Sequence, residues 1–166
     1  MGPRMVEKRR NIPLAAVVIV AVLVADQLSK LWILGRFPVI GQSVEVTDFF
    51  NIVRVANRGV SFGLFNNGAA ANAIVFSLLA AAIVAALIVW LFRASGTLLP
   101  VAIGLVIGGA IGNVADRLRL GSVVDFLDFH LGAWHFPAFN VADSAICIGV
   151  GLMLIDGLIG GHEASN

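Results

Sequence analysis

The segment "GLVIGGAIGNVADR", Gly104 to Arg117, decides the fold, because an apolar, glycine-rich stretch ends in polar residues. Its regularly spaced glycines are Gly104, Gly108 and Gly112. Residues four apart share one face of a helix, and small residues on such a face let helices approach closely inside a membrane. Its polar end consists of Asn113, Asp116 and Arg117. We therefore expect a closely packed helix that carries a polar tip to one membrane surface.

The composition of the whole chain indicates a membrane protein. Of its 166 residues, 59% are hydrophobic and only 13% are charged, and the mean hydropathy is +0.96. These values lie outside the range of soluble proteins, so lipid must cover part of the apolar surface. The single cysteine, Cys147, excludes an internal disulfide framework and a cysteine-rich metal site. We expect Cys147 to be a small core residue.

Four apolar segments are long enough to cross a bilayer, which requires about 20 helical residues. They cover residues 12–34, 69–92, 98–117 and 139–160. A cleaved signal peptide is the alternative for the first segment. However, cleavage after Ala25 would place Leu23 where a small residue is needed. We therefore expect a membrane α-helical protein in which residues 1–166 form one domain with four transmembrane helices.

The basic residues near the N-terminus predict the topology. Arg4, Lys8, Arg9 and Arg10 form a cluster that places the N-terminus in the cytoplasm. Four spans then return the C-terminus to the cytoplasm, although the total number of basic residues is slightly larger on the other side. The extracytoplasmic loops cover residues 35–68 and 118–138. The first contains "SVEVTDFFNIVRVAN", whose Val, Ile and Phe residues predict strands, and the second adds one or two more. We expect a small extracytoplasmic β-element on the outer leaflet.

Nearly all ionisable residues near the predicted spans fall at this outer face. Asp26 and Lys30 lie four residues apart at the end of the first span, so they share a helix face and can pair. Polar residues at membrane depth are candidates for a functional site. Two alternatives involve no functional site. Asp26 and Lys30 would form a plain ion pair at the membrane interface, and Arg117 would only fix the orientation of its helix in the membrane.

The fourth span begins with a second polar group. Asn140, Asp143, Ser144, Cys147 and Gly151 occur there at helical spacing. A carboxylate is costly to expose to lipid, so this face should look into the helix bundle.

Three aspartates lie in "VVDFLDFHLGAWHFPAFNVAD", Val123 to Asp143, and they are Asp125, Asp128 and Asp143. Two carboxylates held close together share a proton. One can then activate water while the other polarises a scissile carbonyl, as in aspartic proteases. A metal site using His130 and His135 would match no ligand spacing that we know, and no Gly-x-Ser-x-Gly motif supports a serine nucleophile. A carboxylate pair is the chemistry that remains.

Five sequence blocks occur in an order that resembles the lipoprotein signal peptidase family, also called signal peptidase II. They are "DQLSK" (Asp26–Lys30), "NRGVSFG" (Asn57–Gly63), "GGAIGNVADR" (Gly108–Arg117), "VVDF" (Val123–Phe126) and "FNVADS" (Phe139–Ser144). The resemblance covers almost the whole chain. It implies a four-span aspartic peptidase whose catalytic pair is Asp125 and Asp143.

The resemblance also implies which residues support the catalytic pair or bind substrate: Asp26, Lys30, Asn57, Gly59, Asn113, Asp116, Arg117 and Asn140. Asp128 falls outside the pair, and we expect it on the polar surface of the second outer loop. The second block departs from the usual family pattern at Arg58, Val60 and Ser61. This departure affects the expected details of substrate binding rather than the chemistry.

The family acts on prolipoproteins whose cysteine carries a diacylglyceryl group, and it cuts just before that cysteine. We therefore expect these substrates and membrane lipid as partners. We also expect a monomer in the bacterial cytoplasmic (inner) membrane, with its active site at the extracytoplasmic face and with no metal, cofactor or nucleic acid.

Two other classes of function remain open at this point. A proton- or ion-coupled transporter would use the same acids as a relay, but such acids usually lie near the bilayer midplane. An assembly subunit would use them to pair helices. That function does not explain why Asp125 and Asp143 belong to separate elements.

Overall fold

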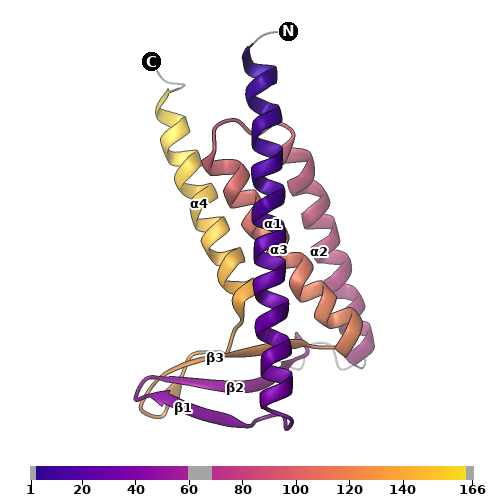
Figure 1. The fold of residues 1–166 in the computed structure, drawn as a ribbon, viewed down its shortest axis with the longest axis vertical. Coiled ribbons are helices and arrows are strands. Elements are labelled where there is room, and N and C mark those ends of the chain that lie inside the picture. The colour runs from indigo at the N-terminus through magenta and orange to yellow at the C-terminus, as the bar shows by residue number, and fades with distance from the viewer. Residues whose placement is uncertain (1–2, 60–68, 164–166) are drawn as a thin grey trace.

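A computed structural model describes residues 3–59 and 69–163 and confirms four long helices with a small antiparallel sheet. The helices are α1 (Pro3–Arg36), α2 (Ala69–Leu91), α3 (Leu98–Leu120) and α4 (Val141–Glu163). The strands are β1 (Ser43–Thr47), β2 (Phe50–Asn57), β3 (Val123–Leu131) and β4 (Trp134–His135). The sheet lies across one end of the helices, and the N-terminal end of α1 and the C-terminal end of α4 lie at the opposite end (Figure 1).

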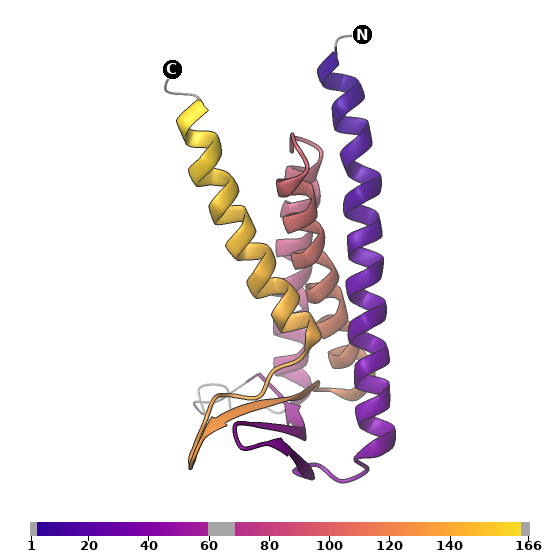
Figure 2. The same ribbon diagram turned by 60° about the vertical axis from the view of Figure 1, so that its left-hand side comes forward.

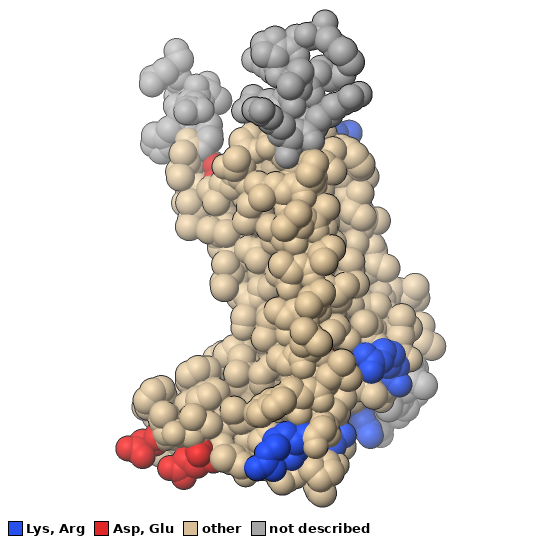
Figure 3. All heavy atoms as spheres, viewed as in Figure 1, with Lys and Arg blue, Asp and Glu red and all other residues tan. Residues whose placement is uncertain are grey.

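Each helix contains an apolar stretch long enough to cross a membrane. These stretches are Asn11–Arg36, Asn72–Leu91, Leu98–Leu120 and Val141–Ile159. Large apolar side chains such as Val17, Leu78 and Leu158 are exposed on α1, α2 and α4. On the face that Figure 3 draws, the described surface along the middle of the helices carries no charged side chain. The structure is therefore that of a multi-pass membrane protein whose outer helix faces are covered by lipid.

Helix α3 is the centre of the bundle, since it contacts each of the other helices and most of its residues are buried. Its glycines explain how α1 can lie so close. A Cβ atom on Gly104 would come within 2.9 Å of the Ala15 carbonyl oxygen, and one on Gly108 would come equally near the Cβ of Val22. The predicted glycine face is confirmed, and α1 packs on it.

Helix α4 packs on another face of α3 through a second set of small residues. Gly109 of α3 lies directly against the Ala142 carbonyl oxygen. Gly149 of α4 leaves a Cβ position only 2.7 Å from the Ala102 carbonyl oxygen. The expectation that the face with Cys147 is turned into the bundle was wrong for Cys147, which is exposed. The contact uses Gly149 rather than Gly151, so α4 is rotated from the expected orientation.

The four strands form one sheet in the order β1-β2-β3-β4, with antiparallel neighbours, which confirms the predicted strands in both outer loops. Val124 and Phe126 of β3 pack against Ile33 and Phe37 at the end of α1. This apolar cluster fixes the sheet to the helices. Strand β3 therefore leaves α3 along a defined path, which places Asp125, between Val124 and Phe126, at the helix ends.

The boundaries of α3 and α4 differ from the predicted ones for local reasons. Helix α3 continues to Leu120, where Gly121 adopts a left-handed conformation (φ 71°) and donates its N–H to the Arg117 carbonyl at 3.0 Å. Helix α4 begins at Val141 instead of residue 139. The backbone of Phe139 is occupied by antiparallel hydrogen bonds with Leu127. Helix α1 extends beyond both predicted ends, and α2 ends one residue earlier.

The contact between α3 and α4 makes Gly109→Ala destabilising. A methyl group there must displace the backbone of Ala142, and overpacking of this kind costs about 1–3 kcal/mol. Gly151→Ala in α4 is the matched control, because a Cβ atom there meets no atom within 4 Å. We expect thermal unfolding in detergent to show a lower Tm for the first variant only. Equal Tm values would contradict the role given to Gly109.

Candidate active site

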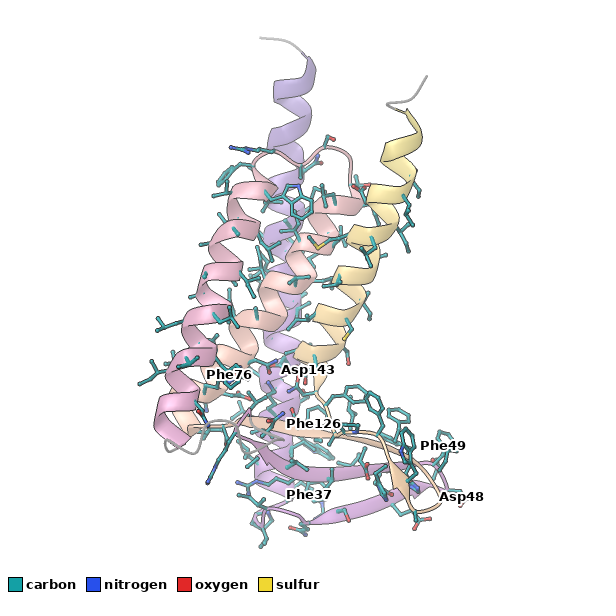
Figure 4. All side chains as sticks on the ribbon, turned by 180° about the vertical axis from the view of Figure 1, so that it is seen from behind. Phe37, Asp48, Phe49, Phe76, Phe126 and Asp143 are labelled. Carbon is teal, nitrogen blue, oxygen red and sulfur yellow. The ribbon has the colours of Figure 1, made fainter. Side chains whose placement is uncertain are left out.

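Asp125 of β3 and Asp143 of α4 lie at the junction of the sheet and the helices, where Figure 4 labels Asp143. Asp125 is buried and Asp143 is partly exposed. Asn140 joins them: its Nδ2 donates to Asp125 Oδ1 at 2.6 Å, and its backbone N–H donates to Asp143 Oδ2 at 3.3 Å. The fold therefore brings the two predicted catalytic carboxylates to one asparagine.

Asn140 and Asp143 also form a reciprocal cap at the start of α4. The N–H of Asp143 donates to Asn140 Oδ1 at 2.9 Å, while the Asp143 carboxylate accepts the N–H of Asn140. This is the capping-box arrangement, with Asn and Asp in place of the usual residues. It holds Asp143 in the first turn of α4. The Asn-x-x-Asp spacing carried this signal, which sequence reasoning did not use.

Asn113 of α3 connects Asp143 to the only lysine among the described buried residues. Its Oδ1 accepts from Lys30 Nζ at 3.0 Å and from Asn140 Nδ2 at 3.2 Å. Because an ammonium group can only donate, the amide oxygen must face Lys30. The Nδ2 of Asn113 is thereby directed at Asp143 Oδ1, 2.7 Å away.

The Lys30 ammonium lies between two buried carboxylates. Its Nζ is 2.9 Å from Asp26 Oδ2 and 2.9 Å from Asp116 Oδ2. With Asn113 as the third acceptor, all three N–H bonds of the ammonium have a partner. The predicted pairing of Asp26 with Lys30 is confirmed, and it belongs to a larger network that joins α1 to α3.

Each of these two carboxylates also holds the backbone beside a candidate catalytic residue. Asp26 Oδ1 accepts the N–H of Ala142 at 2.9 Å, and Ala142 precedes Asp143. Asp116 Oδ2 accepts the N–H of Val124 at 3.1 Å, and Val124 precedes Asp125. The two acids on α1 and α3 therefore position the two segments that carry Asp125 and Asp143.

Asn57 and Gly59 hold Asp125 from the side of β2. Asn57 Nδ2 donates to Asp125 Oδ2 at 2.9 Å, and the N–H of Gly59 donates to Asn57 Oδ1 at 2.8 Å. Gly59 has a φ of +80°, and a Cβ atom there would lie 2.6 Å from the ring of Phe76. Only glycine fits this turn without strain. Val60 and Ser61, where the second block departs from the family pattern, lie outside the described residues.

Arg117 lies near the carboxylates but makes no ion pair with them among the described residues. One of its Nη atoms donates to the Asn113 carbonyl at 3.4 Å, and the guanidinium lies 5.5 Å from the centre of the Phe76 ring. Figure 4 shows Phe76 on α2 at the sheet end of the bundle. This contact leaves most of the donor capacity of Arg117 available to a bound molecule.

Gln27 is a part of the network that sequence reasoning missed. Its Nε2 lies 3.1 Å from both Asp26 Oδ2 and Asp116 Oδ1, and its Oε1 accepts from Arg119 at 3.1 Å. Its spacing of three residues from Lys30 was the available signal, because that spacing places both on one helix face.

Asp128 was predicted on the polar loop surface, and this prediction was wrong because only 8% of it is exposed. Strand pairing places it opposite Asn51, whose Nδ2 donates to it at 2.9 Å, and His135 Nδ1 lies 2.9 Å from its Oδ1. Burial raises the pKa of Asp128, but these hydrogen bonds outweigh it and leave the pKa below its usual value. Among the described residues, no group of three or more His, Cys, Asp or Glu side chains could hold a metal ion.

The environment of Asp125 favours its protonated form. Burial is the largest effect, the hydrogen bond from Asn57 opposes it, and the charge of Asp143 adds to it, so that the pKa of Asp125 rises to about 6. The network contains four carboxylates (Asp26, Asp116, Asp125 and Asp143) around the single ammonium of Lys30. The charge of Asp143 close to Asp125 favours retention of a proton on Asp125, which is what acid–base chemistry by a carboxylate pair requires.

The fold and site define an integral membrane protein of four helices with a polar site at one end. Two solved structures, each described as a bacterial membrane enzyme, share this fold at 34% sequence identity. The first has a TM-score of 0.78 over 88% of this chain and 93% of that one. The second has a TM-score of 0.75 and covers 88% of both chains.

The family model described as signal peptidase (SPase) II matches residues 18–159. Lipoprotein signal peptidase of Shewanella loihica is 47% identical over 144 residues, which cover 86% of this chain and 84% of the relative. The Burkholderia cenocepacia protein of the same name is 48% identical over 139 residues, 82% of each chain. The chain therefore belongs to the signal peptidase II family and is a membrane peptidase.

The raised pKa of Asp125 can be tested directly by infrared difference spectroscopy. A protonated carboxyl band should be present at pH of about 5 and should disappear as the pH rises through about 6. Asp125→Asn should lack this titrating band, and Asp48→Asn, which changes an exposed aspartate, should retain it. A band that titrates near pH 4 would show that burial does not control Asp125.

Removal of the Lys30 ammonium should strongly destabilise the protein. Lys30→Met leaves Asp26 and Asp116 buried without their cation, a loss of about 3–5 kcal/mol. The triple variant Asp26→Asn, Lys30→Met, Asp116→Asn removes all three charges and should recover part of the lost Tm. If Lys30→Met kept the parental Tm in detergent, the ammonium would not be the centre of the network.

Proposed function

We propose that this protein is an aspartic endopeptidase that removes signal peptides from diacylglyceryl-modified bacterial prolipoproteins, cutting just before the lipidated cysteine. Membership of the signal peptidase II family supports the removal of signal peptides from prolipoproteins. The observation that supports the aspartic chemistry is the bridge through Asn140, which contacts Asp125 and Asp143 together.

The hydrogen bonds distinguish this pair from the other two acids of the network. Asp26 and Asp116 are each paired with Lys30, and each also holds a backbone N–H. Among the described residues, Asp125 and Asp143 accept hydrogen bonds from asparagines without a paired cation. They are therefore the acids free to exchange protons. Their position at one end of the helices also favours a peptidase over an ion relay, which places acids near the midplane.

The two environments suggest different roles for the two acids. Burial favours the neutral form of Asp125, which would donate a hydrogen bond to the scissile carbonyl oxygen. Asp143 lies in the first turn of α4 and accepts hydrogen bonds from the amide of Asn113 and the N–H of Asn140, and it would take a proton from the attacking water. Collapse of the tetrahedral intermediate then breaks the C–N bond, and the proton held by Asp143 passes to the leaving nitrogen.

The proposed topology places the sheet and the site at the extracytoplasmic face of the cytoplasmic (inner) membrane, with both termini in the cytoplasm. The basic cluster before the first span supports this orientation. The N-terminal end of α1 and the C-terminal end of α4 lie opposite the sheet, as the topology requires (Figure 1). A site at this level lets the acyl chains of a substrate, or of membrane lipid, stay in the leaflet. One chain supplies both acids, which supports a monomer.

The carboxylate pair is tested by Asp125→Asn and Asp143→Asn in separate proteins. Each should lower cleavage of a diacylglyceryl-modified prolipoprotein by roughly 10²–10⁴-fold or more, because each removes one half of the acid–base pair. The measurement is release of signal peptide by purified protein in detergent, with the elution profile as a check of folding.

Asp128→Asn is the matched control for this experiment, since Asp128 is a buried aspartate on the same strand whose bonds go to Asn51 and His135. It should keep activity within a few-fold of the parent. Near-parental cleavage by either variant of the pair would exclude the proposed chemistry. Loss of activity on treatment with chelators, with recovery on adding a divalent ion, would also contradict it.

A further inference from the structure

The end of the sheet farthest from the helices exposes a group of large apolar side chains, which we call the aromatic tip. Its members are Phe49, Phe129, Leu131, Trp134 and Phe136. Leu131 is 74% exposed and Trp134 is 63% exposed. These side chains and His130 surround a shallow apolar hollow of about 410 Å³. An exposed apolar surface of this kind on a protein indicates an interaction surface.

The aromatic tip has an acidic edge. Glu45 and Asp48 are exposed on β1 and in the turn that follows it. Figure 3 shows acidic side chains at the tip on the side away from the helices. In Figure 4, Phe49 lies nearer to the helices than Asp48. The tip therefore presents apolar side chains toward the level of the membrane-spanning helices and acidic ones away from it.

We propose that the aromatic tip inserts into the headgroup–acyl boundary of the membrane beside the helices. The sheet projects sideways from the helix ends, so its helix-facing side meets the same leaflet that covers those ends (Figure 2). Trp and Phe side chains are favoured at this boundary. Acidic groups are repelled by lipid phosphates, so the orientation of Glu45 and Asp48 toward water fits this partner.

The tip is held rigidly by the buried cluster around Asp128. Asp128 accepts hydrogen bonds from Asn51 of β2 and from His135 of β4, so three strands are joined at one carboxylate. The rings of His130 and His135 stack with their centres 4.9 Å apart. Trp134 is therefore carried by a braced hairpin, and insertion of its side chain requires little further ordering.

A chain of ring contacts connects the tip to the carboxylate pair. Phe139 lies 5.9 Å from Phe129 and 6.0 Å from Phe136 between ring centres. Its backbone is paired with Leu127, and the next residue is Asn140, which contacts both acids. Insertion of the tip would thus set the height of the site relative to the lipid. This consequence rests on the proposed function, because height matters for a substrate anchored by acyl chains.

Fluorescence quenching tests the insertion without any use of activity. Of the three tryptophans, Trp32 and Trp90 are replaced by Phe, which leaves Trp134 as the reporter in the full-length protein. The protein is placed in phospholipid nanodiscs whose acyl chains carry bromine near the headgroup or near the terminal methyl. We expect several-fold stronger quenching by the shallow bromine than by the deep one, and weak quenching by aqueous iodide. Strong iodide quenching without quenching by either lipid would overturn the proposal.

A pair of substitutions tests the consequence for cleavage. Trp134→Glu should raise KM for a lipidated prolipoprotein several-fold in nanodiscs and leave kcat nearly unchanged, whereas Trp134→Phe should behave as the parent. In detergent micelles all three proteins should be equal. A parental KM for Trp134→Glu in nanodiscs, or an equal loss in micelles, would overturn the role of the tip. If the parent itself did not cleave this substrate, the proposed function would fail while the quenching result still decided the insertion.

Discussion

The structure depends on one buried ammonium group. Lys30 joins α1 to α3 through Asp26 and Asp116, and through Asn113 it reaches the acid at the start of α4. In a membrane protein the hydrophobic effect does little to hold helices together, so packing and polar contacts of this kind must specify their arrangement. Because uncompensated charges are costly in such surroundings, the network exists only when all of its members meet. Assembly of the bundle and assembly of the site are therefore one event.

The glycines of α3 make this network geometrically possible. Gly112 leaves room for Asp26, whose Oδ2 would lie 2.5 Å from a Cβ atom at that position. At Gly108 the backbone of α3 comes almost into contact with α1, and at Gly109 it comes almost into contact with α4. Side chains as short as aspartate and asparagine can then span the gaps between helices. The small residues that allow close helix packing thus also set the distances between the acidic residues at the end of the bundle.

Much of this architecture was predictable because it depends on local patterns. Long apolar runs predicted the helices, alternation predicted the strands, and helical spacing predicted the contact of Asp26 with Lys30. The errors concern properties that depend on how elements meet. The burial of Asp128 follows from the register of two strands, and the exposure of Cys147 follows from the rotation of α4. The bridging role of Asn140 required segments that are adjacent only in the folded chain.

The raised pKa of Asp125 lowers the stability of the fold at neutral pH. Asp125 has a pKa of about 6 in the folded protein, against an ordinary value of 3.8 for an aspartate. The folded state therefore binds this proton more tightly than the unfolded chain does. Stability is unaffected below the lower value and declines as the pH rises toward the upper one, a loss of about 3 kcal/mol at neutral pH. A protein could avoid this loss by leaving Asp125 exposed, but an exposed carboxyl would release its proton too readily to serve as an acid. The burial that lowers the stability of the fold is thus the same burial that favours the proposed role of Asp125 as an acid.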